Sequence, residues 1–197
     1  MLFAYDKRFD EVLKRGANYR PGETQMKFGL QSANIKPVMV DDGVRFEWGE
    51  VVVEYINSDG RNVGRKVQAG DTTDSFSGIV ARNATATYNV LSEQVTQYAP
   101  RLTISVFKGN REGVITVPVQ EVHSTPVTVG GDVYVRVAES ATNPDLPIGG
   151  IETEAITDET VLWENAKFAE PLTYPFQEEK FTDASGATTA VAGIEIK

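Results

Sequence analysis

The chain has 197 residues, no cysteine and a single histidine, His123. The absence of cysteine excludes disulfides, thiolate metal sites and cysteine nucleophiles. With one histidine, a zinc site would need at least two carboxylate ligands. A catalytic nucleophile that is activated by a histidine base would have to use His123. Extended backbone around "VQEVHSTPV" turns the neighbouring Ser124 away from His123. These scarcities predict a protein that is not an enzyme and binds no metal or cofactor.

Long apolar runs and an excess of positive charge are also missing. No stretch approaches the roughly 20 apolar residues of a membrane-spanning helix, and the first segment, "MLFAYDKRFDEVLKRG", is too charged for a signal peptide. The formal net charge of −9 argues against nucleic acid as a partner, because contacts to phosphate need clustered Lys and Arg. We therefore expect a soluble protein that is made in a cytoplasm and has neither a membrane nor a nucleic acid as its partner.

The charge is distributed unevenly along the chain. Residues 1–40 hold seven Lys and Arg against four Asp and Glu, whereas residues 151–197 hold three against ten. Two explanations stay open: an ordinary solvated surface, or a basic amino-terminal arm that meets an acidic surface on a neighbouring subunit or partner.

Hydrophobic periodicity predicts a mainly β protein, either a β-barrel or a β-sandwich, because apolar residues alternate with period two between glycine and proline breaks. The only helical spacing is that of Phe9, Val12 and Leu13, in a short helix that Asp6 caps and Gly16 ends. We expect an extended arm with this short helix over residues 1–43, and a single β domain over 44–197. A polar, glycine-rich loop near 56–74 is expected to be exposed and mobile.

Three strand details are predicted. In "VRFEWGEVVVEY", Gly49 shifts the phase, so that the following valines straddle a bulge. "LTISVFKGNREGVITVPV" is the clearest hairpin. "VTVGGDVYVRV" predicts a second hairpin with a loop of three residues, 130–132, which collects every valine on one face and puts Tyr134 and Arg136 on the other.

The remaining candidate sites are weak. "NSDGRNVG" contains oxygen ligands suited to calcium, but its glycine stands at position four rather than six of an EF-hand loop. Turn chemistry explains these Asn, Asp and Gly residues better. Trp163 is either a core residue or a contact anchor, and both alternatives stay open.

The second half of the chain resembles a known family. "FSGIVARNATA", "YAPRLTISVFKGNREGVITVPV", "VTVGGDVYVRV", "VLWENAKF" and "ASGATTAVAGIEIK" are similar to segments of the structural cement, or head-decoration, proteins of tailed bacteriophages. The resemblance covers about residues 75–197. The matching positions are Phe76, Gly78, Val106, Gly109, Gly113, Val117, Gly131, Val133, Tyr134, Val135, Ala166, Phe168, Gly193 and Ile196.

The resemblance implies a virion structural protein on the capsid surface, made in a bacterial host, that binds the major capsid protein and stabilises the head shell. It also implies a homo-oligomer, commonly a trimer. The alternative function is a carbohydrate-binding or hydrolytic β domain of a phage tail component, which predicts an exposed aromatic platform near paired acids.

Self-association through the amino-terminal arm is expected on physical grounds as well. Segment 17–40 has too little apolar periodicity to fold on itself, yet it carries several large apolar side chains that a neighbouring subunit would cover. The expected assembly contacts are Arg15, Arg20, Lys27, Phe28 and Trp163.

Overall fold

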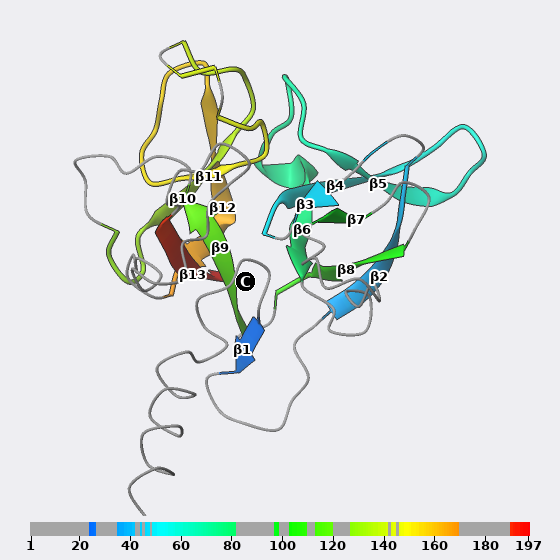
Figure 1. The fold of residues 1–197 in the computed structure, drawn as a ribbon, viewed down its shortest axis with the longest axis horizontal. Helices are drawn as coiled ribbons and strands as arrows, with labels where there is room; N and C mark the ends of the chain where they lie inside the picture. Colours follow the sequence, from blue (N-terminus) through cyan, green and yellow to red (C-terminus); the bar gives the residue numbers. More distant parts are fainter. Residues whose placement is uncertain are drawn as a thin grey trace, which may run out of the picture.

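The computed structural model describes residues 24–26, 35–41, 44, 46–47, 49–81, 97–98, 103–109, 113–119, 127–141, 143–144, 146–169 and 190–197. These residues form strands β1 to β13 and one short 3-10 turn, η2 (Thr73–Ser75) (Figure 1). The prediction of a mainly β protein is confirmed, and of the two architectures left open, barrel and sandwich, the structure contains a closed barrel. The helix expected between Asp6 and Gly16 lies outside the described residues.

Five strands form a closed barrel in the order β2-β5-β4-β6-β8. Their bounds are β2 Ile35–Val40, β5 Asn62–Lys66, β4 Val51–Ile56, β6 Phe76–Ala81 and β8 Thr103–Phe107. Only β2 and β5 run parallel; the other pairs are antiparallel. A separate pair joins β3 (Phe46–Glu47) to β7 (Gln97–Tyr98).

The remaining strands form what we call the carboxyl-terminal sheet (Figure 1). Its strands are β1 Thr24–Met26, β9 Gly113–Val119, β10 Asp132–Arg136, β11 Ile151–Glu152, β12 Thr160–Phe168 and β13 Ala190–Ile196. The pairings run from β9 through β11, β10, β12 and β13 back to β9, and β1 is added to the start of β9. The sheet therefore closes on itself apart from this extra strand.

Two ranges assigned from the sequence differ from the observed elements. Strand β2 lies within the range expected to be an arm, because its alternation turns Val38 and Val40 into the barrel. Strand β5 and the first two residues of the turn η2 lie within the range expected to be a loop. Glycine at position 64 makes β5 look like a loop in the sequence, but a Cβ there would lie 3.1 Å from both Val38 and Val52, so the strands approach closely at this point.

The barrel interior and the carboxyl-terminal sheet have separate apolar clusters that meet across β4 and β6. Val52 belongs to the cluster inside the barrel, whereas Val51 and Val53 belong to the larger cluster of the carboxyl-terminal sheet. A strand buried on both faces needs an uninterrupted apolar run, which explains the three consecutive valines. A bulge lies beside these valines, but on the partner strand: the β4–β6 register shifts between Val52 and Val53, and the extra residue is Ser77 of β6 rather than a residue of β4.

Both predicted hairpins are wrong. Strand β8 pairs with β2 and β6 in the barrel, whereas β9 pairs within the carboxyl-terminal sheet, so the two consecutive strands enter different sheets. At the glycine pair, Gly131 donates to the carbonyl of Thr128 and closes a turn, and the positive φ of Gly130 suits its third position. Residues 127–129, just before this turn, pair with no part of β10, because β11 and β12 occupy both of that strand's edges.

Candidate functional site

Metal-binding clusters are absent from the described part of the chain. No group of three or more His, Asp or Glu residues there is arranged to hold a metal ion. No helix among the same residues is long and apolar enough to cross a membrane. His123 lies outside the described residues. The features that point to function are therefore surfaces and charge networks.

The loop weighed for calcium binding uses its oxygens to form a turn. The side-chain oxygen of Asn57 accepts hydrogen bonds from the backbone N–H groups of Asp59, at 3.0 Å, and Arg61, at 2.9 Å. Asn62 donates to Glu54. This is the turn chemistry that the sequence indicated.

An exposed apolar surface lies on the outer face of β2. Ile35, Pro37 and Met39 alternate there with the buried Val38 and Val40, and Ile35 is 39% and Met39 43% exposed. We call these three residues the β2 stripe. Single exposed apolar residues are ordinary, whereas neighbouring ones on one face of a strand form an apolar surface that is a candidate for a contact.

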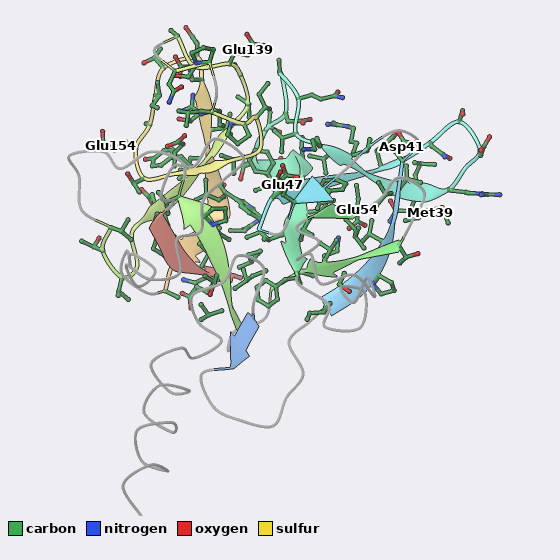
Figure 2. All side chains as sticks on the ribbon, in the orientation of Figure 1. Met39, Asp41, Glu47, Glu54, Glu139 and Glu154 are labelled. Carbon is green, nitrogen blue, oxygen red and sulfur yellow. The ribbon has the colours of Figure 1, made fainter. Side chains whose placement is uncertain are left out.

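A segment rich in acidic residues lies on a different part of the molecule. Residues 137–166 contain seven acidic residues and no Lys, Arg or His. This range includes the loops that join β10, β11 and β12. Glu139 and Glu154 lie on these loops, on the side of the molecule away from Met39 (Figure 2). We call this range the acidic segment.

A buried network of ion pairs links the acidic segment to β10. Arg136 donates from Nε and Nη2 to Oε1 of Glu152, at 3.0 and 2.7 Å, and from Nη1 to Oε2 of Glu159, at 2.6 Å. The side chains of Arg136 and Glu152 are 0% exposed and that of Glu159 is 14% exposed. Oε1 of Glu159 accepts from the backbone N–H of Ala141 at 2.9 Å. One arginine thus fixes both loops to β10.

The charges of this network stabilise one another. Burial by itself lowers the pKa of Arg136, but its hydrogen bonds to Glu152 and Glu159 outweigh burial, so the pKa is raised overall. The backbone N–H of Ala141, followed by the guanidinium of Arg136, lowers the pKa of Glu159. Arg136 was predicted on the face opposite the valines, and this is confirmed; its burial beneath the loops on that face was not predicted. The sequence nevertheless contained a sign of its ion pairing, because no other basic residue follows Arg136 until Lys167.

A second ion pair stabilises the barrel. Arg65 binds Asp71 through two hydrogen bonds of 2.7 and 2.8 Å, and Asp71 also accepts from the backbone N–H of Gln68. The guanidinium carbon lies 5.9 Å from the ring centre of Tyr55, whose hydroxyl donates to Asp41. This arrangement ties the segment after β5 to the end of β4.

The Asp71→Asn substitution is expected to destabilise the protein at neutral pH and to have less effect as the pH falls. The hydrogen bonds from Arg65 hold the pKa of Asp71 below its ordinary value, with the backbone N–H of Gln68 acting in the same direction. Such a carboxyl group contributes stability above its unfolded-state pKa of about 4 and loses it as the pH falls through the folded-state value. Urea unfolding at pH 7 and at several values below 4 measures the difference.

The Glu50→Gln substitution is a control with the opposite sign. Burial raises the pKa of Glu50, although its ion pair with Lys66 acts against the shift. The contribution of Glu50 is therefore full below its unfolded-state pKa and is lost as the pH rises through the raised folded-state value. The advantage of the wild type over this variant should grow as the pH falls. A pH-independent effect of Asp71→Asn would contradict the assignment.

The residues expected to make assembly contacts fall into two groups. Arg15, Arg20, Lys27 and Phe28 lie outside the described residues. Trp163 is 1% exposed and packs edge-on against Phe76 of the barrel, with ring centres 5.6 Å apart. Of the two alternatives left open by the sequence, Trp163 is therefore a core residue. It connects the barrel with the carboxyl-terminal sheet.

The positions that carry the family resemblance are structural. Of the apolar ones, Val106, Val117, Val133 and Val135 are 0% exposed. A Cβ on Gly109 would lie 2.4 Å from the carbonyl oxygen of Ile196, so glycine is required where the chain leaves β8 beside the last strand. The resemblance thus rests on the core rather than on a reactive site.

Comparison with known proteins gives one family match. A family model described as structural cement protein (E217 gp24/Pam3 gp6) matches residues 18–197. None of the curated proteins compared with the chain matches it. The family match covers nearly the whole chain, including both sheets and the network around Arg136. The chain belongs to the structural cement protein family of bacteriophages.

Proposed function

We propose that this cement protein binds the outer surface of a phage head, contacts the major capsid protein and stabilises the shell against internal pressure. The family match over residues 18–197 is the observation that carries the proposal. The β2 stripe supports it, because a closed barrel holds these apolar side chains on a rigid outer face. The proposed role is mechanical and involves no catalysis.

The protein is also proposed to act as a homo-oligomer, in keeping with the trimer that the resemblance implies. A closed ring gives every subunit the same contacts, whereas an open arrangement would grow into filaments. The amino-terminal residues before β1 are proposed to contribute, with Arg15 and Arg20 facing the acidic segment of a neighbour. Exposed ion pairs contribute only about 0–1 kcal/mol each, so these charges orient the subunits and apolar burial supplies most of the affinity.

The alternative function, a carbohydrate-binding or hydrolytic tail domain, predicts an exposed aromatic platform. In the part of the chain that the structure describes, the large exposed apolar side chains are Ile35, Met39, Ile56 and Val129. None of these is aromatic. The described residues therefore favour an assembly surface over a sugar-binding face.

Binding to heads that lack the protein tests the proposed function. We expect the full-length protein to cosediment with such heads, and the Ile35→Glu and Met39→Glu variants to bind at least tenfold more weakly, a loss of about 1.4 kcal/mol or more. The reason is that a charge on the β2 stripe would have to be desolvated in the contact. Both positions are exposed, so the variants should fold normally.

Val129→Glu is the matched control, because this side chain is 69% exposed and lies in the turn before β10, outside the barrel. It should bind like the wild type. Absence of binding by the wild-type protein would overturn the head-binding role. Equal binding by the stripe and control variants would overturn the stripe as the contact while leaving that role intact.

A further inference from the structure

Three side chains with complementary chemistry meet at one end of the barrel. Glu54 lies near the end of β4, Asn62 begins β5, and Lys108 follows β8. Each is two residues from a position that faces the barrel interior, namely Val52, Gly64 and Val106 respectively. Because side chains of a strand alternate between faces, all three belong to the inner side of the barrel at its rim.

The carboxylate of Glu54 holds both of the other groups. Its Oε2 accepts a hydrogen bond of 2.8 Å from the side-chain nitrogen of Asn62. Its Oε1 is buried and forms an ion pair with Nζ of Lys108. The side chains of Glu54 and Lys108 are only 17% and 18% exposed, whereas that of Asn62 lies at the solvent-exposed rim. An amine and a carboxamide are thus gathered around one carboxylate.

A glycine keeps the path between these groups open. Gly78 lies on β6, between β4 and β8, and pairs with Val52. A Cβ on Gly78 would lie 2.4 Å from the carbonyl oxygen of Phe107 and 2.7 Å from a methyl carbon of Val106. Only glycine therefore fits at this inward-facing position of β6, between Glu54 and Lys108.

The amine of Lys108 is suited to act as a nucleophile. Burial, assisted by the positive charge of Lys36, lowers the pKa of Lys108 to about 8. The carboxylate of Glu54 offers an acceptor for the proton that the ammonium must lose. A partly buried lysine beside a proton acceptor is an arrangement that activates amines.

We propose that Lys108 and Asn62 form an intramolecular isopeptide bond, with Glu54 as the group that transfers the protons. Glu54 first takes a proton from Nζ of Lys108. The side-chain amide of Asn62 rotates by half a turn, so that the protonated Glu54 donates a hydrogen bond to its carbonyl oxygen. Nζ of Lys108 then attacks the side-chain carbonyl carbon of Asn62. The new C–N bond forms, the bond from that carbon to the amide nitrogen breaks, and ammonia leaves into solvent with a proton as ammonium. Glu54 ends as the carboxylate it was at the start.

This bond would join strands that are not neighbours in the barrel. Strand β5 is separated from β8 by β2 on one side and by β4 and β6 on the other. A covalent link between Asn62 and the end of β8 would staple the barrel across its rim and close a loop of the chain. Cross-links of this kind stabilise a fold mainly by restricting the unfolded chain. Such a staple resists opening of the barrel under load.

Intact-mass spectrometry of the denatured full-length protein tests the proposal. The mass is expected to fall short of the sequence mass by one ammonia molecule, after allowance for removal of Met1. Trypsin should release a branched peptide that joins residues 62–65 to residues 102–111, because Lys108 is no longer a cleavage site once its amine is acylated. A wild-type mass equal to that of the sequence would overturn the proposal.

Variants separate this reaction from other losses of ammonia. Lys108→Arg, Asn62→Ser and Glu54→Gln should each retain the full mass. The Lys66→Arg variant is the matched control: its lysine also pairs with a carboxylate, Glu50, but no carboxamide shares that carboxylate in the described contacts. It should lose ammonia as the wild type does. A loss that persists in Lys108→Arg would place the reaction elsewhere and contradict the assignment.

Discussion

The Arg136→Met substitution is expected to lower the free energy of unfolding by about 3–5 kcal/mol, because it leaves Glu152 as an uncompensated charge in the interior. Both side chains are 0% exposed, so water cannot replace the lost hydrogen bonds. The loss is a large part of the 5–15 kcal/mol that is typical of a whole domain. Urea unfolding at pH 7 followed by circular dichroism measures it.

The Arg136→Lys variant distinguishes charge from geometry. Lysine keeps the positive charge, but it cannot reproduce three hydrogen bonds that reach Glu152 and Glu159 from different guanidinium nitrogens. We expect this variant to recover only a minor part of the lost stability. Full recovery would mean that charge alone accounts for the network.

The double variant Arg136→Met, Glu152→Met separates the desolvation of Glu152 from the value of the ion network. Apolar residues of similar size often replace a buried ion pair without loss. Glu159 then loses its guanidinium but keeps its hydrogen bond from Ala141 and its partial exposure. The double variant should be more stable than Arg136→Met alone. A double variant that is no more stable would show that the arginine acts mainly by holding the loops.

The class of fold could be predicted from the sequence because it depends on local pattern. Period-two alternation identified the mainly β fold. Asn57 behaves as its turn chemistry requires. Each of these features is decided by residues within a few positions of one another.

Strand pairing could not be predicted because it depends on competition between distant segments. The chain around Gly130 was assigned to a hairpin from its own valines. In the structure, the backbone N–H of Gly130 donates to Phe168, and that of Phe168 donates to Gly131. Strand β12 thus takes the place that a local partner would have filled. The two sheets of the protein separate between β8 and β9 for the same reason.

The candidate site was partly accessible from the sequence. The family resemblance follows from buried glycines and valines, which a pattern can reveal. The network of Arg136 could not be found by alternation, because alternation places this residue opposite the core and says nothing about which loops cover that face. The β2 stripe was hidden as well: Ile35 and Met39 are exposed, but they occur within the same six residues as the buried Val38 and Val40.

Removal of residues 1–40 is expected to unfold the barrel, whereas removal of residues 1–22 is not. The longer deletion removes β2, which lies between β5 and β8 and closes the barrel. It also removes Val38 and Val40, which are 5% and 3% exposed, and burial of a valine is worth about 1.5–3 kcal/mol. The strands beside the gap would in addition expose their backbone hydrogen-bonding groups. The loss is comparable with the stability of an ordinary domain.

The shorter deletion keeps β1 and β2 and therefore tests the amino-terminal residues for assembly alone. Thermal unfolding of the two truncated proteins should show a cooperative transition for 23–197 and none for 41–197. Light scattering of 23–197 at tens of micromolar then reports its oligomeric state. A folded but monomeric 23–197 beside an oligomeric full-length protein would support the proposed arm. A cooperative transition in 41–197 would contradict the role of β2 in closing the barrel.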